Sequence, residues 1–397
     1  MLLTVSKRLE FSASRRLFLP QLSAEDNRRR FGEEAAASYG SGRNYVAYFV
    51  FSGEADPVTG MLINISEIKQ RAGEIINAHY DHRYLNEDNP AFRDVVPTVE
   101  NVALQLYKEV SPLFAGDRAQ LAAVHLRETP FRSATAYANG GVDGNFWFEF
   151  SAARRTMSPH LSEAENEQLF GPSVRDHGHN YRVRLSVDGE SERSDMFALI
   201  EQLRLALDHK HLNTDVPALR DQPVTTESLA RLILRETRDR STVTRVRLHE
   251  RHDFFVEAWR NDEMQIAMRN SFGAAHRLHV PQFSEAQNAD LFGKCNNPRG
   301  HGHYYITEAT IAATYDERSG AGFNFEQMRD GMCESLEGWR DKHLDREAEE
   351  FRERTSTGEN IVAALWPKVN ERVGDRLYRL RLWETANNRF TLRRIPQ

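Results

Sequence analysis

The chain has 397 residues, a formal net charge of −6 and a pI near 6.2. This acidic balance gives no general attraction to nucleic acids or anionic membranes, and no apolar run has the length of a membrane span. Two cysteines are too few for a disulfide framework, and the first residues do not have the order of a signal peptide, so we expect a cytoplasmic protein.

Three blocks of the chain share one sequence pattern, which suits a length of about three small domains. The blocks open with similar strand motifs at Phe11, Phe150 and Phe272. Identical spacing of the residues that follow indicates an internal repeat. The matching positions are a Leu or Phe before a serine (Leu22, Leu161, Phe283), an asparagine (Asn27, Asn166, Asn288) and a Phe-Gly pair (Phe31, Phe170, Phe292).

Each block predicts the order strand, short helix, strand, long helix, strand. The short helices begin with capping boxes at Ser162 and Ser284 and with a near variant at Ser23. Second strands are expected at 181–187 and 304–312, and final strands at 121–128, 243–250 and 377–384. This order predicts an α+β protein with a largely antiparallel sheet.

Domain boundaries are expected where the composition loosens. The glycine-rich segment 136–144 is interpreted as a linker, and the polar segment 260–263 as a tighter junction. We therefore expect domains at 1–137, 138–260 and 261–397.

The third block contains a candidate metal site. His301 and His303 are two residues apart, so on a strand both imidazoles point to one face, and His276 ends another alternating strand. Three histidines leave one position of a tetrahedral Zn²⁺ open, as in catalytic zinc sites. Cys295 is placed as a thiolate beside the metal, where a cation would lower its pKa.

These residues resemble the 6-pyruvoyl-tetrahydropterin synthase family. The shared motifs are Phe-x-Ala-x-His-Arg-Leu at 272–278, a helix at 283–288, Phe-Gly-Lys-Cys-Asn-Asn-Pro-x-Gly-His-Gly-His at 292–303, and Trp-Glu-Thr at 383–385. The resemblance implies a tunnelling fold (T-fold). Three tandem repeats would form a pseudo-trimeric antiparallel β-barrel ring with helices outside, and two rings would meet face to face as a homodimer.

The resemblance also implies an activity. The substrate would be the pterin 7,8-dihydroneopterin triphosphate, a small molecule, and the enzyme a zinc-dependent carbon–oxygen lyase of tetrahydrobiopterin biosynthesis that eliminates triphosphate. Glu384 would bind the pterin ring and Cys295 would move protons, while Mg²⁺ would accompany the triphosphate. Candidate cations for the triphosphate are Lys294, Arg299, Arg15 and Arg154.

The first two repeats depart from the family at the metal ligands. Arg15, Ser41 and Arg43 take the histidine positions of the first repeat, and arginine has no lone pair for a metal. The second repeat keeps His177 and His179 but has Arg154 at the third position and Ser173 near that of the cysteine. We expect one Zn²⁺ per chain. Glu128 and Glu250, at the position of Glu384, are either remnants of pterin pockets or structural.

A second family motif is distributed in the opposite way. Its Asp-His pair, which works with the cysteine, is present in the first two repeats and replaced in the third by Arg340-Asp341, with His343 an uncertain substitute. Within one ring of fused repeats, a composite site would combine zinc and Cys295 of the third repeat with the pair of the first or second repeat, giving one site per chain. The two candidates are Asp81-His82 and Asp208-His209.

Two alternatives remain open. One is 6-carboxytetrahydropterin synthase of the deazapurine (queuosine) pathway, whose members have a shorter gap than that between Cys295 and His301. The other is a pterin-binding protein without catalysis, which the retention of all three histidines and Cys295 disfavours.

Overall fold

The structure is a computed structural model that describes residues 1–189, 193–238 and 242–395. Within these residues, one set of elements occurs three times. The first set is β1 (Leu2–Arg15), α1 (Ala24–Phe31), β2 (Ser41–Gly53), α2 (Ile65–His79), β3 (Arg83–Tyr84), α3 (Leu85–Asp88), α4 (Val99–Val110), β4 (Gln120–Thr129) and β5 (Arg132–Tyr137). The second is β6 (Val142–Arg154), α5 (Glu163–Phe170), β7 (His177–Asp188), α6 (Arg193–Leu207), β8 (Lys210–His211), α7 (Leu212–Asp215), α8 (Thr226–Glu236), β9 (Val243–Arg251) and β10 (Phe254–Trp259). The third is β11 (Met264–His276), α9 (Glu285–Phe292), β12 (His301–Ala313), α10 (Phe325–Glu337), β13 (Lys342–His343), α11 (Leu344–Glu347), α12 (Gly358–Arg372), β14 (Leu377–Thr385) and β15 (Asn388–Arg393).

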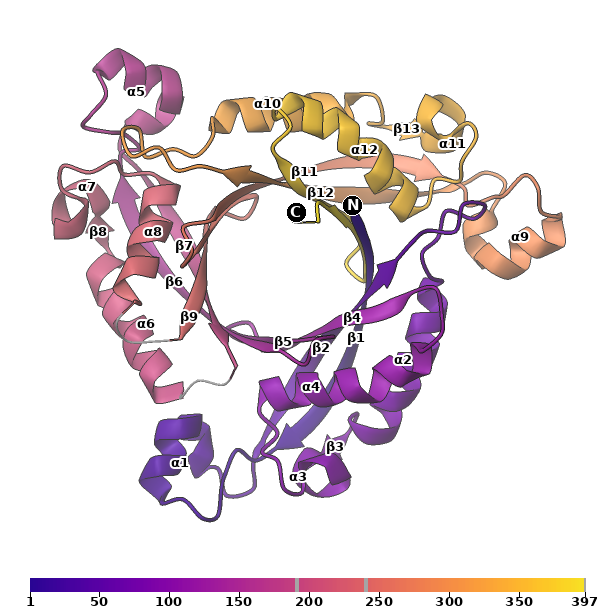
Figure 1. The fold of residues 1–397 in the computed structure, drawn as a ribbon, viewed down its shortest axis with the longest axis horizontal. Helices are drawn as coiled ribbons and strands as arrows, with labels where there is room; N and C mark the ends of the chain where they lie inside the picture. The colour runs from indigo at the N-terminus through magenta and orange to yellow at the C-terminus, as the bar shows by residue number, and fades with distance from the viewer. Residues whose placement is uncertain (190–192, 239–241, 396–397) are drawn as a thin grey trace.

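Twelve strands close into one antiparallel barrel, and the helices lie on its outside (Figure 1). The strand order is β10-β9-β7-β6-β5-β4-β2-β1-β15-β14-β12-β11, and β11 pairs again with β10. Neighbouring repeats are joined by the pairs β5–β6, β10–β11 and β15–β1. In the part of the chain that the structure describes, closure leaves no long strand edge exposed. The predicted tunnelling fold, a ring of three repeats in one chain, is confirmed.

Two details differ from the sequence prediction. Each final strand is followed by a hairpin partner, β5, β10 or β15, which completes a four-strand unit. Segment 136–144 is therefore not a linker but the tight turn of the β5–β6 hairpin. Its turn is closed by Gly140 N–H donating to the carbonyl of Tyr137 at 2.9 Å, and Gly140 has a positive φ of 83°, which glycine adopts without strain.

Successive residues along each strand point alternately to the outside and to the inside of the barrel, and the two faces differ in chemistry. Outward-facing residues such as Val246 and Leu248 of β9 are fully buried, where α8 packs on the strand. The inner face carries ion pairs instead: Arg184 and Arg247 bind the buried carboxylate of Glu257 at 2.6 and 2.9 Å. The apolar core therefore lies between barrel and helices. No helix in the described part of the chain has the length and apolar character needed to cross a membrane.

Candidate functional site

The three predicted ligand histidines lie together where β11 and β12 meet. In their antiparallel register His276 pairs with His301 and Ala274 pairs with His303, which puts all three imidazoles on one face. One ring nitrogen from each lies within 4.8 Å of the other two. The Nε2 atoms of His276 and His301 are 3.1 Å apart. This is the one such cluster of at least three potential ligands in the described residues.

The positions and hydrogen bonds of the histidine ring nitrogens suit the coordination of a metal ion. Nδ1 of His276 lies 2.9 Å from the carbonyl oxygen of Ser356, so Nδ1 carries the proton and Nε2 has a free lone pair. Nε2 of His303 is buried without a hydrogen-bond partner. Tetrahedral zinc with bonds near 2.0–2.1 Å would separate two nitrogens by about 3.3 Å. The His276–His301 spacing is close to that value, so the residues fit the ion.

Burial favours the neutral imidazoles of His301 and His303. Desolvation, followed by the neighbouring His276 and His303, lowers the pKa of His301 to about 4. Burial also lowers the pKa of His303, although Glu384 opposes this. Neutral imidazole is the form that coordinates a metal.

Asp345 and Ser356 hold His276 in place. The Ser356 hydroxyl donates to Oδ1 of Asp345 at 2.7 Å, and Oδ2 of Asp345 accepts from the backbone N–H of Arg277 at 2.7 Å. In the other repeats an asparagine occupies the place of Asp345. Asn86 and Asn213 bind the backbone of Arg16 and Arg155 in the same way.

Cys295 lies in a single turn of 3₁₀ helix (Gly293–Asn296) beside the histidines, half-buried. Its backbone carbonyl accepts from Leu278 N–H at 3.0 Å, which anchors the loop to the end of β11. Burial and then Glu384 raise the pKa of the Cys295 thiol, while Lys294 lowers it. The residues of the chain thus favour the thiol, and a cation bound by the histidines is the group that would favour the thiolate.

Glu384 completes one side of this site. Its Oε1 is 3.8 Å from Nε2 of both His276 and His303, and its Oε2 accepts from the side-chain amide of Asn388 at 3.1 Å. Glu384, Cys295, His301 and His303 line one cavity of about 620 Å³.

The first repeat supplies the opposite wall of this cavity. Lys7 of β1 and residues around the start of α2, including Ile63 and Lys69, line it. Glu359 at the start of α12 ties the two repeats together, because its buried carboxylate accepts from Leu62 N–H at 2.9 Å. Burial raises the pKa of Glu359 to about 7. The site is therefore located at the junction of the third repeat with the first.

Neither predicted Asp-His pair lines this cavity. Asp81 accepts from Ser12 N–H and Asp208 from Ser151 N–H, each beside its own repeat's first strand. The imidazoles of His82 and His209 are 83% and 84% exposed. Both residues have positive φ, as does Asp341 (59°), which supports the alignment of Asp341 with the histidine position.

His343, the uncertain substitute for the missing pair, does not line the cavity that contains Cys295. It lies beneath the loop that carries Cys295, where a Cβ added to Gly300 would come within 2.5 Å of its Nε2. Neither of its ring nitrogens has a hydrogen-bond partner in the described residues, and it is not part of the cavity lining.

Ion pairs replace the metal site in the first repeat. The Arg15 guanidinium is fully buried, donates from Nε to Glu128 at 2.8 Å and from Nη2 to Glu34 at 2.9 Å, and Glu34 takes the position of Cys295. Arg43 also pairs with Glu34, and Arg193 of the second repeat lies 3.5 Å from Glu128. Burial favours the acid form of Glu128, but Arg15 and Arg193 hold its pKa below the usual value.

The second repeat has a related arrangement. Arg154 binds Glu250 at 2.5 Å, and His179 lies 3.2 Å from the same carboxylate. The adjoining cavity has a volume of only about 80 Å³. Glu128 and Glu250 are thus engaged by arginines, which favours a structural role over remnants of a pterin pocket. Arg15 and Arg154 are likewise committed to these pairs.

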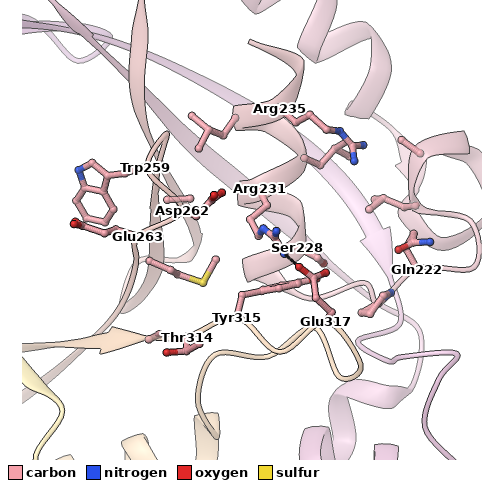
Figure 2. A pocket seen from close by; sticks show the side chains of 18 of the residues that line it. Gln222, Ser228, Arg231, Arg235, Trp259, Asp262, Glu263, Thr314, Tyr315 and Glu317 are labelled. Carbon is pink, nitrogen blue, oxygen red and sulfur yellow. Dashed lines mark hydrogen bonds and ion pairs between the residues drawn. The ribbon is translucent and has the colours of Figure 1, made fainter. Parts of the chain in front are cut away.

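A further cavity of about 560 Å³ lies between α8 and the β10–β11 turn (Figure 2). Arg231 donates to Glu317 at 2.8 Å and stacks on the Tyr315 ring. Arg238 lies 3.8 Å from Asp262. The cavity is lined by none of the predicted site residues.

Comparison with known proteins agrees with the repeat structure. The family model for 6-pyruvoyl tetrahydropterin synthase matches residues 4–139, 145–261 and 265–394. The 6-pyruvoyl tetrahydrobiopterin synthase of Drosophila melanogaster is 35% identical over 131 residues, covering 32% of this chain and 78% of the relative. The human protein of that name is 36% identical over 132 residues, covering 32% and 90%. The solved structure of Caenorhabditis elegans 6-pyruvoyl tetrahydropterin synthase has 32% identity and a TM-score of 0.32, covering 33% of this chain and 95% of that one.

Proposed function

Because the chain belongs to the 6-pyruvoyl tetrahydropterin synthase family, we propose that it converts 7,8-dihydroneopterin triphosphate to 6-pyruvoyl-tetrahydropterin with loss of triphosphate. The observation that carries this proposal is the cavity that joins His301, His303, Cys295 and Glu384, with His276 behind them. The proposal includes one catalytic site per chain, in the third repeat.

Zinc is the proposed metal, held by His276, His301 and His303. When bound, it would act as a Lewis acid that makes the C–H bonds next to the side-chain oxygens of the substrate more acidic. Neutral nitrogen ligands in a site with an open position suit zinc.

The other residues of the cavity have separate roles. The Cys295 sulfur takes a proton from the substrate side chain and returns one, as general base and then acid. The Glu384 carboxylate accepts hydrogen bonds from the amino and ring N–H groups of the pterin. This orients the side chain of the substrate toward the histidines. Asn388 orients Glu384 through the amide hydrogen bond at 3.1 Å.

An Asp-His pair is the proposed partner of Cys295 in proton transfer. Since both pairs lie outside the cavity and are exposed, we propose that the pair comes from a second ring facing this one. Each chain would then contribute zinc and Cys295 to one site and a pair to the site of its partner.

The experiment is product analysis by mass spectrometry. Zinc-loaded protein is incubated with 7,8-dihydroneopterin triphosphate, with Cys295→Ala as the matched variant. We expect a 6-pyruvoyl product and free triphosphate from the wild type, and neither from the variant, which should retain its zinc. A 6-carboxy product with acetaldehyde would instead assign the chain to the carboxy-forming reaction. Unchanged substrate would support a pterin-binding protein without catalysis.

A further inference from the structure

Lysine is rare in this chain, and it is concentrated at the site. There are only seven lysines, and three of them, Lys7, Lys69 and Lys294, line the cavity that holds Cys295 and Glu384. Among the described residues, no carboxylate lies within ion-pair distance of these three ammonium groups, whereas Lys368 pairs with Glu350. Three positive charges therefore face one cavity without a paired anion.

The three lysines come from two repeats. Lys7 lies on β1 of the first repeat, opposite Asn388 of β15, and donates to the side-chain oxygen of Asn388 at 2.9 Å. Lys69 lies on α2 of the first repeat, and Lys294 precedes Cys295 in the third. Lys7 is half-buried, while Lys69 and Lys294 are exposed. Lys7 is thus the least exposed of the three, and it lies close enough to Glu384 to interact with it electrostatically.

The position of Lys7 is electrostatically unfavourable for an ammonium group. Burial, followed by repulsion from Lys69, lowers the pKa of Lys7, while Glu384 raises it. An anion between the two ammonium groups would replace this repulsion with attraction on both sides.

Comparison among the repeats shows that the charge of Lys7 is specific to one junction. Lys7 stands four residues before the Phe11 motif, and the same position holds Phe146 in the second repeat and Met268 in the third. Phe146 faces the cavity that contains Arg43 and Glu128, and Met268 is buried in the core. The lysine occurs only where the strand faces the three-histidine site.

We propose that Lys7, Lys69 and Lys294 form the subsite for the phosphate tail of the substrate. This assignment rests on the proposed function and extends it, because it gives the metal-free first repeat a role in binding substrate. Ammonium groups donate charge-assisted hydrogen bonds to phosphate oxygens, and three in one cavity suit a chain of phosphates better than a single carboxylate. Binding is accordingly expected to weaken as the ionic strength rises.

The test measures equilibrium binding of three ligands to the zinc-loaded full-length protein. These are inorganic triphosphate, 7,8-dihydroneopterin triphosphate and neopterin, which lacks phosphate. The variants are Lys69→Gln and Lys7→Met, the latter placing in β1 the residue that the third repeat has there. Lys108→Gln, an exposed lysine near the end of α4, is the control outside the cavity.

We expect each cavity variant to bind inorganic triphosphate and the phosphorylated pterin about tenfold more weakly, with neopterin affinity within about twofold of the wild type. Lys108→Gln should bind all three ligands normally. Unchanged triphosphate affinity in both cavity variants would overturn the subsite. Equal loss of neopterin and triphosphate would also overturn it, since the lysines would then only shape the cavity. If the wild type binds triphosphate through these lysines but binds neither pterin, the subsite stands and the proposed function fails.

Discussion

The hydroxyl of Ser356 donates a 2.7 Å hydrogen bond to the carboxylate of Asp345, and the backbone carbonyl of Ser356 accepts from His276. The Asp345 carboxylate is thereby connected to His276, a candidate metal ligand, through one intervening residue, Ser356. In the two repeats without a full histidine set, asparagines take the place of Asp345, and Pro97 and Val224 take that of Ser356. The carboxylate–hydroxyl pair therefore occurs only with the three histidines.

This pairing predicts that Asp345 strengthens metal binding. Asp345→Asn keeps an acceptor for Arg277 N–H, as Asn213 does for Arg155, but removes the charge. We expect zinc affinity to fall roughly 10–100-fold, the usual effect of removing such a supporting group. Chelator competition measures it, and Asn213→Asp, the reverse change in the second repeat, should leave affinity unchanged. Equal zinc affinity of wild type and Asp345→Asn would contradict the role.

The buried arginine of the first repeat is predicted to support the fold. Arg15 and Glu128 have side-chain exposures of 0% and 1%. Because Arg15→Ala leaves a buried carboxylate with a weaker partner, we expect the free energy of unfolding to fall by about 3 kcal/mol. Urea unfolding measures this change. Arg299→Ala, at an exposed position, should change it by less than about 0.5 kcal/mol. A loss of that small size in Arg15→Ala would exclude the structural role.

The two Asp-His pairs are predicted to be unequal in catalysis. If one pair serves Cys295 from a facing ring, then either His82→Ala or His209→Ala, but not both alike, should lower kcat by roughly 10²–10⁴-fold. Because both imidazoles are exposed, neither change should alter stability. Steady-state kinetics of the single and double variants checks this. Turnover that survives in the double variant would rule out the shared site.

Stability should depend on pH through two histidines of the inner barrel face. Burial, followed by nearby arginines, lowers the pKa of His125 and His249 to about 3. In the unfolded chain their pKa is about 6.5, so between these values the unfolded state binds more protons. The free energy of unfolding therefore decreases as pH falls below about 6.5.

We expect up to roughly 1.4 kcal/mol of this loss per imidazole between pH 7.5 and 5.5. Urea unfolding at both pH values should show a smaller difference for His125→Gln and His249→Gln than for the wild type. The exposed His82→Gln serves as the control. Identical pH dependence in all four proteins would show that other groups cause it.

Much of the fold could be predicted from local sequence. Repeat spacing and the capping boxes at Ser162 and Ser284 indicated the short helices, and both boxes form. The hairpin strands β5, β10 and β15 were not predicted. For β5 the reason is that the glycines of segment 136–144 are typical of linkers as well as of turns. A linker and a hairpin turn are distinguished only by whether the flanking segments pair as strands. Local sequence does not show this pairing.

The site could be predicted only in part, because some of its residues are brought together by non-local strand pairing. His276, His301 and His303 lie on two strands whose alternation predicts a common face, and they do converge. Lys7 was not recognised, because it reaches the cavity only when β1 pairs with β15, about 380 residues away in sequence. The low number of lysines in the chain could have drawn attention to Lys7, because another of the few, Lys294, is adjacent to Cys295. The ion pair of Glu34 with Arg15 was also not predicted. Glu34 takes the position of Cys295, and its function becomes clear only when the structure shows the arginines around it.

Of the three homologous repeats, only the third is proposed to hold a metal ion. The number of zinc ions per chain can be measured by elemental mass spectrometry on protein of known concentration, with His301→Ala and His179→Ala as matched variants from the third and second repeats. We expect one zinc in the wild type, none in His301→Ala and one in His179→Ala. Two or three zinc ions per wild-type chain, or loss of zinc in His179→Ala, would contradict it.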